Sequence, residues 1–177
     1  MVQDELGNCA DSPVVLKFPL PAKKSRPYKG KAQVIPGVVN PSFFDEGGNG
    51  VGYYDDKINR FSKKFRPSEG VDTSGKIIGQ VLTGEWVRVT VEVKEAGTYK
   101  AVLNYGTPAY GKHKLMMLMD DRHLGDFIMT RHKGDHWAAD SYSTLENLKL
   151  PAGQHVITLI CAGGFNFGEI TFTRTGK

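Results

Sequence analysis

The sequence predicts an all-β fold, either a β-sandwich or a barrel, and three observations support this. Apolar and polar side chains alternate with a period of two in several short segments, which is typical of half-buried strands. Glycine and proline separate these segments, as turns between strands require. No segment of ten or more residues shows a convincing apolar stripe at the 3.6-residue period of a helix. At least seven short strands are therefore expected to form two layers around one core.

The clearest strand covers residues 85–93, where Val87, Val89, Val91 and Val93 fall on one face. A turn at residues 95–97 leads into the next strand, at residues 98–104. Further strands are expected at residues 114–119, 125–130, 155–161 and 165–173. The segment at residues 114–119 is apolar on both faces, which favours a central position in its sheet.

The first 34 residues have a different composition from the rest of the chain. They contain four prolines, and six basic side chains against three acidic ones. Proline blocks helices and interrupts sheet ladders, so residues 1–34 are predicted to be an extended linker or tether, with room for one short strand at residues 14–18. Residues 35–177 are predicted to form a single β domain, which is long enough to bury a core.

Charge and hydropathy exclude two classes of partner at the sequence level. The formal net charge is +4, and residues 35–177 hold 17 basic and 16 acidic side chains. Such a balance lacks the concentrated positive field that phosphate binding needs, which argues against nucleic acid. No apolar run approaches the roughly 20 residues that span a bilayer, so no membrane span is predicted.

Cysteine and histidine spacing gives little support for metal chemistry. Cys161 ends an apolar segment and is predicted to be a buried thiol. A disulfide bridge between Cys161 and Cys9 is an alternative that the sequence does not decide. His132 and His136, with Asp135 between them, resemble a metal spacing, but a zinc site needs three or four converging ligands. Histidines of this loop are more simply candidates for hydrogen bonds to a ligand.

Motifs spread in order over residues 35–177 resemble those of family 6 carbohydrate-binding modules. Residues 35–55 read I-P-G-V-V-N-P-S-F-F-D-E-G-G-N-G-V-G-Y-Y-D, close to the family opening I-P-G-x-I-E-A-E-x-Y-D-x-G-G-x-G-V-A-Y-x-D. Residues 79–99 resemble the family segment V-G-Y/W-x-x-x-G-E-W-x-x-Y-x-V-x-V and the A-G-x-Y that follows it. L-P-A-G-Q-H at residues 150–155 and G-G-F-N-F at residues 163–167 resemble the closing L-x-A-G-x-H and G-x-F-N-L. Each motif is weak alone, but their order is specific.

The resemblance implies a jelly-roll β-sandwich of two antiparallel sheets that binds polysaccharide or oligosaccharide and carries out no reaction. Modules of this family are usually attached to glycoside hydrolases that bacteria secrete. A glycoside hydrolase domain in the same parent chain is therefore an implied partner. The implied location is secreted, periplasmic or at the cell surface.

The resemblance also implies a sugar site in loops at one end of the sandwich, made of two aromatic rings and an asparagine. Asn166 takes the asparagine position, and Trp137, which lies in a polar loop, takes the position of one ring. The second ring position is occupied by Gln80. Tyr53 or Tyr54 is expected to supply the missing ring, because that segment borders the same end of the sandwich in the family.

The sequence departs from the family at positions that hold a structural calcium in many members. The family's E-A-E acids are Asn40, Pro41 and Ser42 here, and the acid often found two residues after the site asparagine is Gly168. Calcium needs several carboxylate or carbonyl oxygens, so no cofactor is predicted, although structural calcium stays an open alternative. Asn40 and His136 complete the set of candidate ligand contacts.

Three functions remain to be weighed. The first is non-catalytic sugar binding through Trp137 and Asn166, which targets an attached or partner glycoside hydrolase. The second is a degenerate sandwich that serves as a structural or protein-docking domain without sugar binding, suggested by Gln80 and by the altered calcium positions. The third is a glycosidase that uses a carboxylate pair such as Asp55 and Glu169, whose separation in space the sequence does not reveal.

Overall fold

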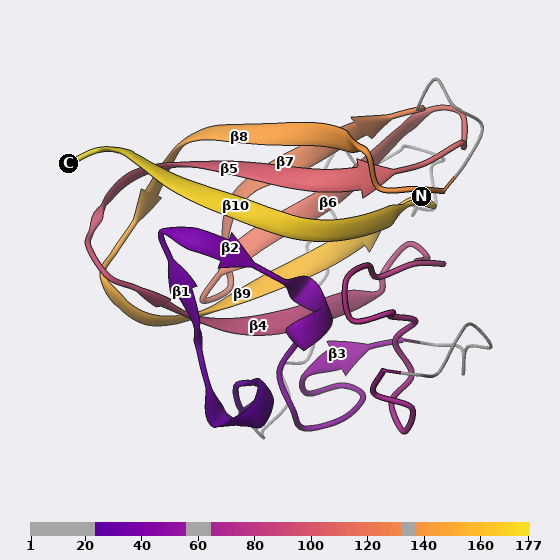
Figure 1. Ribbon diagram of the computed structural model, residues 1–177, viewed down its shortest axis with the longest axis horizontal. Helices are drawn as coiled ribbons and strands as arrows, with labels where there is room; N and C mark the ends of the chain where they lie inside the picture. Colours follow the sequence, from indigo (N-terminus) through magenta and orange to yellow (C-terminus); the bar gives the residue numbers. More distant parts are fainter. Residues whose placement is uncertain (1–23, 56–64, 132–136) are drawn as a thin grey trace, which may run out of the picture.

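Two β-sheets pack face to face in the computed structural model, which describes residues 24–55, 65–131 and 137–177 (Figure 1). The larger sheet has the order β1-β4-β9-β6-β7, with β3 also paired to β4, and the smaller sheet has the order β2-β10-β5-β8. The larger sheet consists of β1 (Gln33–Ile35), β3 (Tyr53–Tyr54), β4 (Trp86–Val93), β6 (Lys112–Met119), β7 (Arg122–Thr130) and β9 (Gly153–Ala162). The smaller sheet consists of β2 (Gly37–Val39), β5 (Gly97–Gly106), β8 (Ser141–Leu150) and β10 (Asn166–Gly176). Two short 3₁₀ turns, η1 (Tyr28–Gly30) and η2 (Pro41–Phe43), precede β3.

The all-β sandwich that the sequence predicts is confirmed, with one correction to its sheets. Strand β1 pairs with β4 in parallel, so the larger sheet is mixed rather than antiparallel. Only Pro36 separates β1 from β2, and the chain therefore passes directly from one sheet to the other. In the described part of the chain, no helix is long and apolar enough to cross a membrane.

Four strands, β1, β2, β3 and β8, are absent from the strands that the sequence predicts, and β8 is the longest of them. In β8 the partly buried Leu145 and the buried Leu148 are three residues apart, which breaks the period of two. The break coincides with a register shift against β5, and Asn147 within it has a φ of 59°. A β-bulge of this kind hides a strand from a simple alternation pattern. The six predicted strands match β4, β5, β6, β7, β9 and β10 to within three residues at each end.

The core lies between the two sheets and is dominated by aliphatic and aromatic side chains. The four valines on one face of β4 are all buried, as their spacing predicts. Opposite them, β10 contributes Phe167 and Phe172, which are fully buried. Burial of each such side chain stabilises the fold by roughly 1.5–3 kcal/mol.

Cys161 is buried in this core as a free thiol, and burial raises its pKa well above the ordinary value, so the thiol stays protonated. Cys9 lies outside the described residues.

The described residues that precede β2 lie against the sandwich. The Ser25 hydroxyl donates a hydrogen bond to the Asp45 carboxylate at 2.7 Å, and Arg26 forms a backbone bridge with Glu46. The Tyr28 ring stacks on Phe43, with 5.4 Å between the centroids. The boundary between linker and domain at residues 34 and 35 stays a prediction, and the strand expected at residues 14–18 lies outside the described residues.

Asp45 is a buried carboxylate that fixes the loop after η2 to the larger sheet. Its oxygens accept hydrogen bonds of 2.7 Å from the Thr90 backbone N–H, the Thr90 hydroxyl and the Ser25 hydroxyl. The side chain is 1% exposed, so no solvent replaces a lost partner. The three bonds join β4, the loop and the segment before η1.

We expect Asp45→Ala to lower the free energy of unfolding by about 3 kcal/mol, because the buried Thr90 N–H loses its acceptor and the hydrogen bonds to a charged group are lost. Urea unfolding followed by circular dichroism measures the change. Glu46→Ala is the control, since its ion pair with Arg26 is solvent-exposed and contributes little. Equal midpoints for the two variants would contradict the assigned role of Asp45.

Candidate functional site

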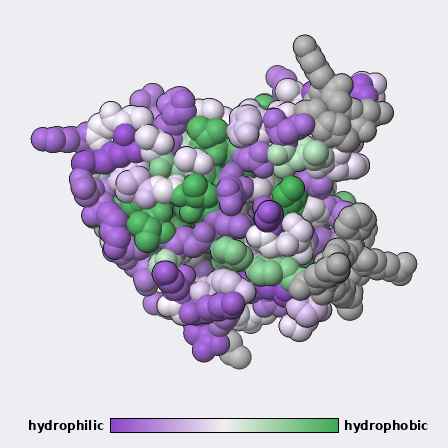
Figure 2. Space-filling model, in the orientation of Figure 1, coloured by the Kyte–Doolittle hydropathy of each residue, from purple (hydrophilic) through white to green (hydrophobic). Residues whose placement is uncertain are grey.

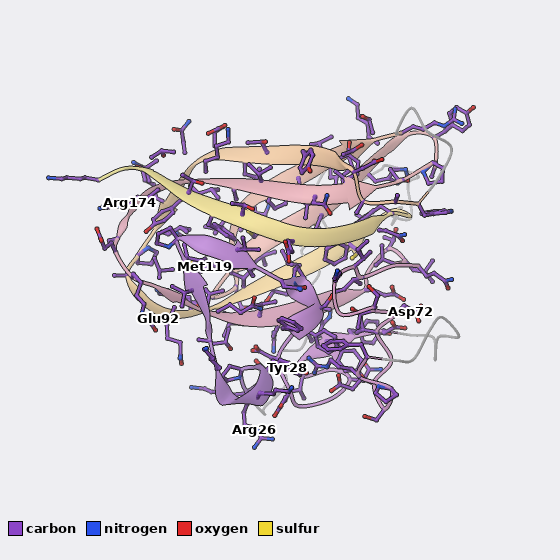
Figure 3. The ribbon with its side chains drawn as sticks, in the orientation of Figure 1. Arg26, Tyr28, Asp72, Glu92, Met119 and Arg174 are labelled. Carbon is purple, nitrogen blue, oxygen red and sulfur yellow. The ribbon has the colours of Figure 1, made fainter. Side chains whose placement is uncertain are left out.

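A cleft of about 550 Å³ opens at the end of the sandwich where β10 begins. Asn166, the first residue of β10, pairs with Gly106 at the end of β5, which fixes the position of the cleft in the fold. The lining residues come from three segments far apart in sequence: Asp72, Thr73, Ser74, Ile77, Gly79, Gln80, Trp137 and Asn166. Figure 3 shows Asp72 at this end of the molecule.

One wall of the cleft, residues 72–80, belongs to no strand and is held by individual backbone hydrogen bonds. Ile78 and Phe167 exchange two such bonds, of 2.8 and 2.9 Å, which attach the wall to β10. Within the wall, the Gly79 N–H donates to the Asp72 carbonyl at 2.9 Å. These bonds fix the backbone of a loop that has few sheet contacts of its own.

Asn166 connects this wall to the segment that carries Trp137. Its Nδ2 donates to the Trp137 carbonyl at 2.9 Å, and its Oδ1 accepts from the Gln80 backbone N–H at 3.3 Å. Gly79 leaves room for the carboxamide, because a Cβ at that position would lie 2.9 Å from Oδ1. A carboxamide has two N–H donors and two acceptor lone pairs, so one of each remains for a ligand.

Trp137 is 49% exposed, and its backbone is fixed from two sides. Asn166 holds the Trp137 carbonyl, and two residues further on the Asn104 Nδ2 donates to the Ala139 carbonyl at 2.6 Å. Gly106 lies directly against this segment, since a Cβ there would be 2.0 Å from the Ala138 carbonyl oxygen. The indole is thus a half-exposed ring on a fixed backbone.

The other sequence candidates lie elsewhere. Tyr53 is buried, its hydroxyl accepts a hydrogen bond from the Gly70 N–H at 2.9 Å, and its ring meets Phe44 edge to face. Tyr54 is half-exposed and lines, with Trp86, a second and narrower depression that adjoins the cleft at Asp72 and Gly79. Neither tyrosine lines the cleft, and His136 lies outside the described residues. The structure therefore brings together Trp137, Asn166 and Gln80, and their role in binding stays a prediction.

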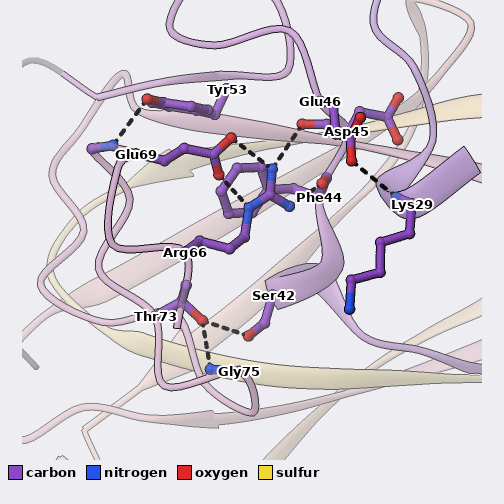
Figure 4. Close-up of polar contacts among 11 residues, drawn as sticks. Lys29, Ser42, Phe44, Asp45, Glu46, Tyr53, Arg66, Glu69, Thr73 and Gly75 are labelled. Carbon is purple, nitrogen blue, oxygen red and sulfur yellow. Dashed lines mark hydrogen bonds and ion pairs between the residues drawn. The ribbon is translucent and has the colours of Figure 1, made fainter. Parts of the chain in front are cut away.

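Asn40 and Ser42 form a hydrogen-bonded network in place of an acidic pair, and Figure 4 shows the part of it that joins Ser42, Thr73 and Gly75. The Asn40 Oδ1 accepts from the Ser42 N–H at 2.9 Å, and its Nδ2 donates to the Gly75 carbonyl at 3.0 Å. The Ser42 hydroxyl accepts from the Thr73 hydroxyl at 2.7 Å, and the Thr73 oxygen in turn accepts from the Gly75 N–H. The network ties η2 to the cleft wall at residues 72–80, so Asn40 supports the wall and does not line the cleft.

The residues at these positions do not fit a calcium ion. Calcium prefers six to eight oxygen ligands that include carboxylates, whereas this network has no carboxylate and its polar atoms are bonded to protein. Gly168 cannot supply an oxygen from a side chain, and a Cβ there would lie 2.6 Å from the Asn104 Oδ1. Among the described residues, no three His, Cys, Asp or Glu side chains converge to hold a metal.

Four of the residues that line the cleft were not predicted from the sequence: Asp72, Thr73, Ser74 and Ile77. Their only sequence signal is position, since they precede the Gly79–Gln80 motif by a few residues. Thr73 and Ile78 form an isolated bridge that turns the segment back on itself, and this brings Asp72 beside Gly79. Such long-range backbone contacts leave no periodic pattern in the sequence.

Solved structures with the same fold include several family 6 carbohydrate-binding modules. A module from Clostridium stercorarium in complex with cellobiose gives a TM-score of 0.58 at 13% identity, over 82% of this chain and 99% of that one. A β-1,3-glucan-binding module from Bacillus halodurans gives 0.57 at 16% identity, over 82% of this chain and all of that one. A module of Cellvibrio mixtus lichenase 5A in complex with cellotriose gives a TM-score of 0.54 at 18% identity, over 79% of this chain and 98% of that one.

These identities establish a shared fold. The chain matches no protein-family model and no curated protein sequence. One further structure, a family 43 arabinoxylan arabinofuranohydrolase from Bacillus subtilis in complex with cellotetraose, matches over 82% of this chain but only 28% of its own length, at 13% identity and a TM-score of 0.57. The jelly-roll sandwich is thus also found as one part of a longer enzyme chain.

We expect the stability of the protein to be independent of calcium, because Asn40 and Ser42 are bonded to Gly75 and Thr73 directly. Thermal unfolding should give the same Tm in EDTA and in millimolar calcium. Ser42→Ala should lower the free energy of unfolding by about 1 kcal/mol in both buffers, since the buried Thr73 hydroxyl loses its acceptor. A Tm that rises by several degrees when calcium is added would show that a calcium site exists.

Proposed function

We propose that this protein is a non-catalytic binding module for oligosaccharide or polysaccharide and that the sugar binds in the cleft. The observation that carries the proposal is the convergence of an exposed indole, Trp137, and a carboxamide, Asn166, in a cleft with further polar side chains. The shared fold with sugar-binding modules supports the same function.

The apolar part of the cleft suits one face of a pyranose. The Trp137 ring offers a large rigid surface whose negative π-face attracts the C–H groups of a sugar. Each weak C–H contact contributes about 0.5–1 kcal/mol, so several are needed for useful affinity. Ile77 adds apolar surface to the same cleft. Because the ring already lies half in solvent, its burial by a sugar removes water from both partners.

The polar part of the cleft suits the hydroxyl rim of the sugar. Asn166 retains one donor and one acceptor, which matches vicinal hydroxyls that both donate and accept. The Asp72 carboxylate and the Ser74 and Gln80 side chains line the cleft around it. Each such hydrogen bond contributes a net free energy of only about 1 kcal/mol, because water competes. Dissociation constants in the micromolar to millimolar range, roughly −8 to −4 kcal/mol, are therefore expected.

The biological use of such a module is to keep an enzyme on its substrate. An attached or partner glycoside hydrolase would act at a higher effective concentration on a polysaccharide to which the module is bound. The match to one part of a longer arabinofuranohydrolase chain supports this arrangement. The corresponding location is outside the cytoplasm, where polysaccharide substrates occur.

The second candidate function is a protein-docking sandwich. Gln80 in place of a second ring favours this candidate, and so does the outer face of the smaller sheet, where Val38 is 51% and Tyr142 69% exposed. Figure 2 shows hydrophobic side chains among polar ones over this sheet. A docking domain would bind no glycan, so glycan binding separates the two candidates.

A panel of native gels, each containing one soluble plant, algal or bacterial polysaccharide, tests the proposal. We expect the protein to migrate more slowly in the gel that contains the glycan it binds. Trp137→Ala should weaken binding at least about tenfold, because the stacking surface is lost, and Trp137→Phe should keep part of the affinity. Tyr142→Ala is the control, since this exposed ring lies outside the cleft. Identical migration of wild type and Trp137→Ala on every glycan would remove the proposal.

A second test disturbs the geometry of the cleft and leaves its polar groups in place. Gly79→Ala puts a Cβ 2.9 Å from the Asn166 Oδ1, which must move and loosen its bonds to both walls. Gly164→Ala is the matched control, because a Cβ there meets no atom within 4 Å. We expect a several-fold weaker affinity by isothermal titration for Gly79→Ala alone. Equal affinities would show that the position of Asn166 does not matter for binding.

A further inference from the structure

Among the described residues, Tyr110 is the most exposed aromatic side chain. It lies in the connection between β5 and β6 and is 80% exposed, well above Trp137. A ring this exposed buries little apolar area on folding, so its surroundings decide whether it has another use. It does not line the cleft, and the proposed function leaves it unexplained.

The connection that carries Tyr110 is fixed to the sandwich. The buried Thr107 hydroxyl donates to the Gly164 carbonyl at 2.8 Å and accepts from the Ala109 N–H at 3.1 Å. The Arg131 guanidinium lies over the Tyr110 ring, 4.1 Å from its centroid, which favours one orientation of the ring through a cation–π contact. A ring held in this way loses little conformational entropy when a ligand stacks on it.

The chain path places Tyr110 close to the cleft. Gly106, four residues earlier, lies directly against Ala138, the residue after Trp137. Four residues of fully extended chain reach at most about 14 Å, which limits the separation of the Tyr110 and Gly106 backbones. The bond from Thr107 to Gly164 also attaches this connection to the segment that leads into Asn166. The end of β5 and the start of β10 lie at the same end of the sandwich (Figure 1), so the connection that carries Tyr110 belongs to the end where the cleft opens.

We propose that Tyr110 is a second sugar contact beyond the cleft and that the ligand is consequently a chain of several sugar units, not a single sugar or a disaccharide. This inference rests on the proposed function of the cleft. One sugar unit occupies the cleft against Trp137, and a later unit of the same chain stacks on the Tyr110 ring.

The surroundings of Tyr110 favour a sugar chain over a protein partner. Its neighbours Gly111, Lys112 and Arg131 are exposed and offer no contiguous apolar area. A stable protein interface buries about 800 Å² per partner around an apolar centre, which a single ring among polar groups does not provide. One rigid ring matches the area of one sugar face, and two contacts on one chain raise affinity with chain length.

The test measures affinity against ligand length. Isothermal titration with a series of oligosaccharides, from two to eight units, of the polysaccharide that retards the wild type gives a dissociation constant for each length. We expect wild-type affinity to rise with length. For Tyr110→Ala the affinity for the shortest ligands that bind should be unchanged, and the affinity for the longest should fall about three- to tenfold. Tyr142→Ala is the matched control, an exposed tyrosine on the outer face of the smaller sheet, and should follow the wild type.

The outcomes separate the two claims. If Trp137→Ala removes binding while Tyr110→Ala matches the wild type at every length, the cleft binds sugar and the second contact is overturned. If Tyr110→Ala weakens the affinity for oligosaccharides of every length by the same factor, the ring acts on the cleft itself and the second contact is also overturned. If no glycan binds to the wild type, both the proposed function and this inference fail. Circular dichroism verifies that the Tyr110→Ala variant is folded.

Discussion

The cleft depends on the carboxamide of Asn166, which hydrogen-bonds the backbones of two segments that lie 86 and 29 residues away in the sequence. Neither segment has a strand at that point, so neither gains the support of a sheet ladder there. Each bond contributes only about 1 kcal/mol to stability, but together they fix the distance between the two walls. Asn166 is itself the first residue of β10, a strand that pairs with β2 on one side and with β5 on the other. A rigid element thus sets the geometry of a site made of loops.

The remaining contacts around the cleft serve the same purpose. Asn104 holds the Trp137 segment from the smaller sheet, Ile78 pairs with Phe167 of β10, and Ser42 bonds Thr73 from η2. Of the residues that form these bonds, which are Asn104, Ala139, Ile78, Phe167, Ser42 and Thr73, only Thr73 lines the cleft. A site whose walls are already fixed needs little ordering when a ligand binds, and this matters most for a weak ligand such as a sugar.

The sequence predicts the sandwich and its main strands well, because burial on one face imposes a period of two that Val87 to Val93 display. It fails for β8, where the bulge at Asn147 breaks that period, and for the direction of β1, which depends on a neighbour distant in sequence. Trp137, Asn166 and Gln80 were predictable as neighbours from ordered motifs. Residues 72–77 were not, because hydrogen bonds to distant segments and not side-chain periodicity place them in the cleft. The motif also leaves open which of the adjacent Tyr53 and Tyr54 faces the core, and in the structure Tyr53 is the buried one.

Gln80 is the position with the widest consequence for the type of ligand. Two rings on opposite walls hold a sugar by both faces. Here one wall offers an indole and the other offers an amide with hydrogen-bonding side chains. A sugar stacked on Trp137 alone has its second face toward polar groups or solvent and gains stacking energy on one face only. Binding energy that a second ring would supply inside the cleft must then come from contacts beyond it. An exposed ring on a fixed connection at the same end of the sandwich, as Tyr110 is, meets that requirement.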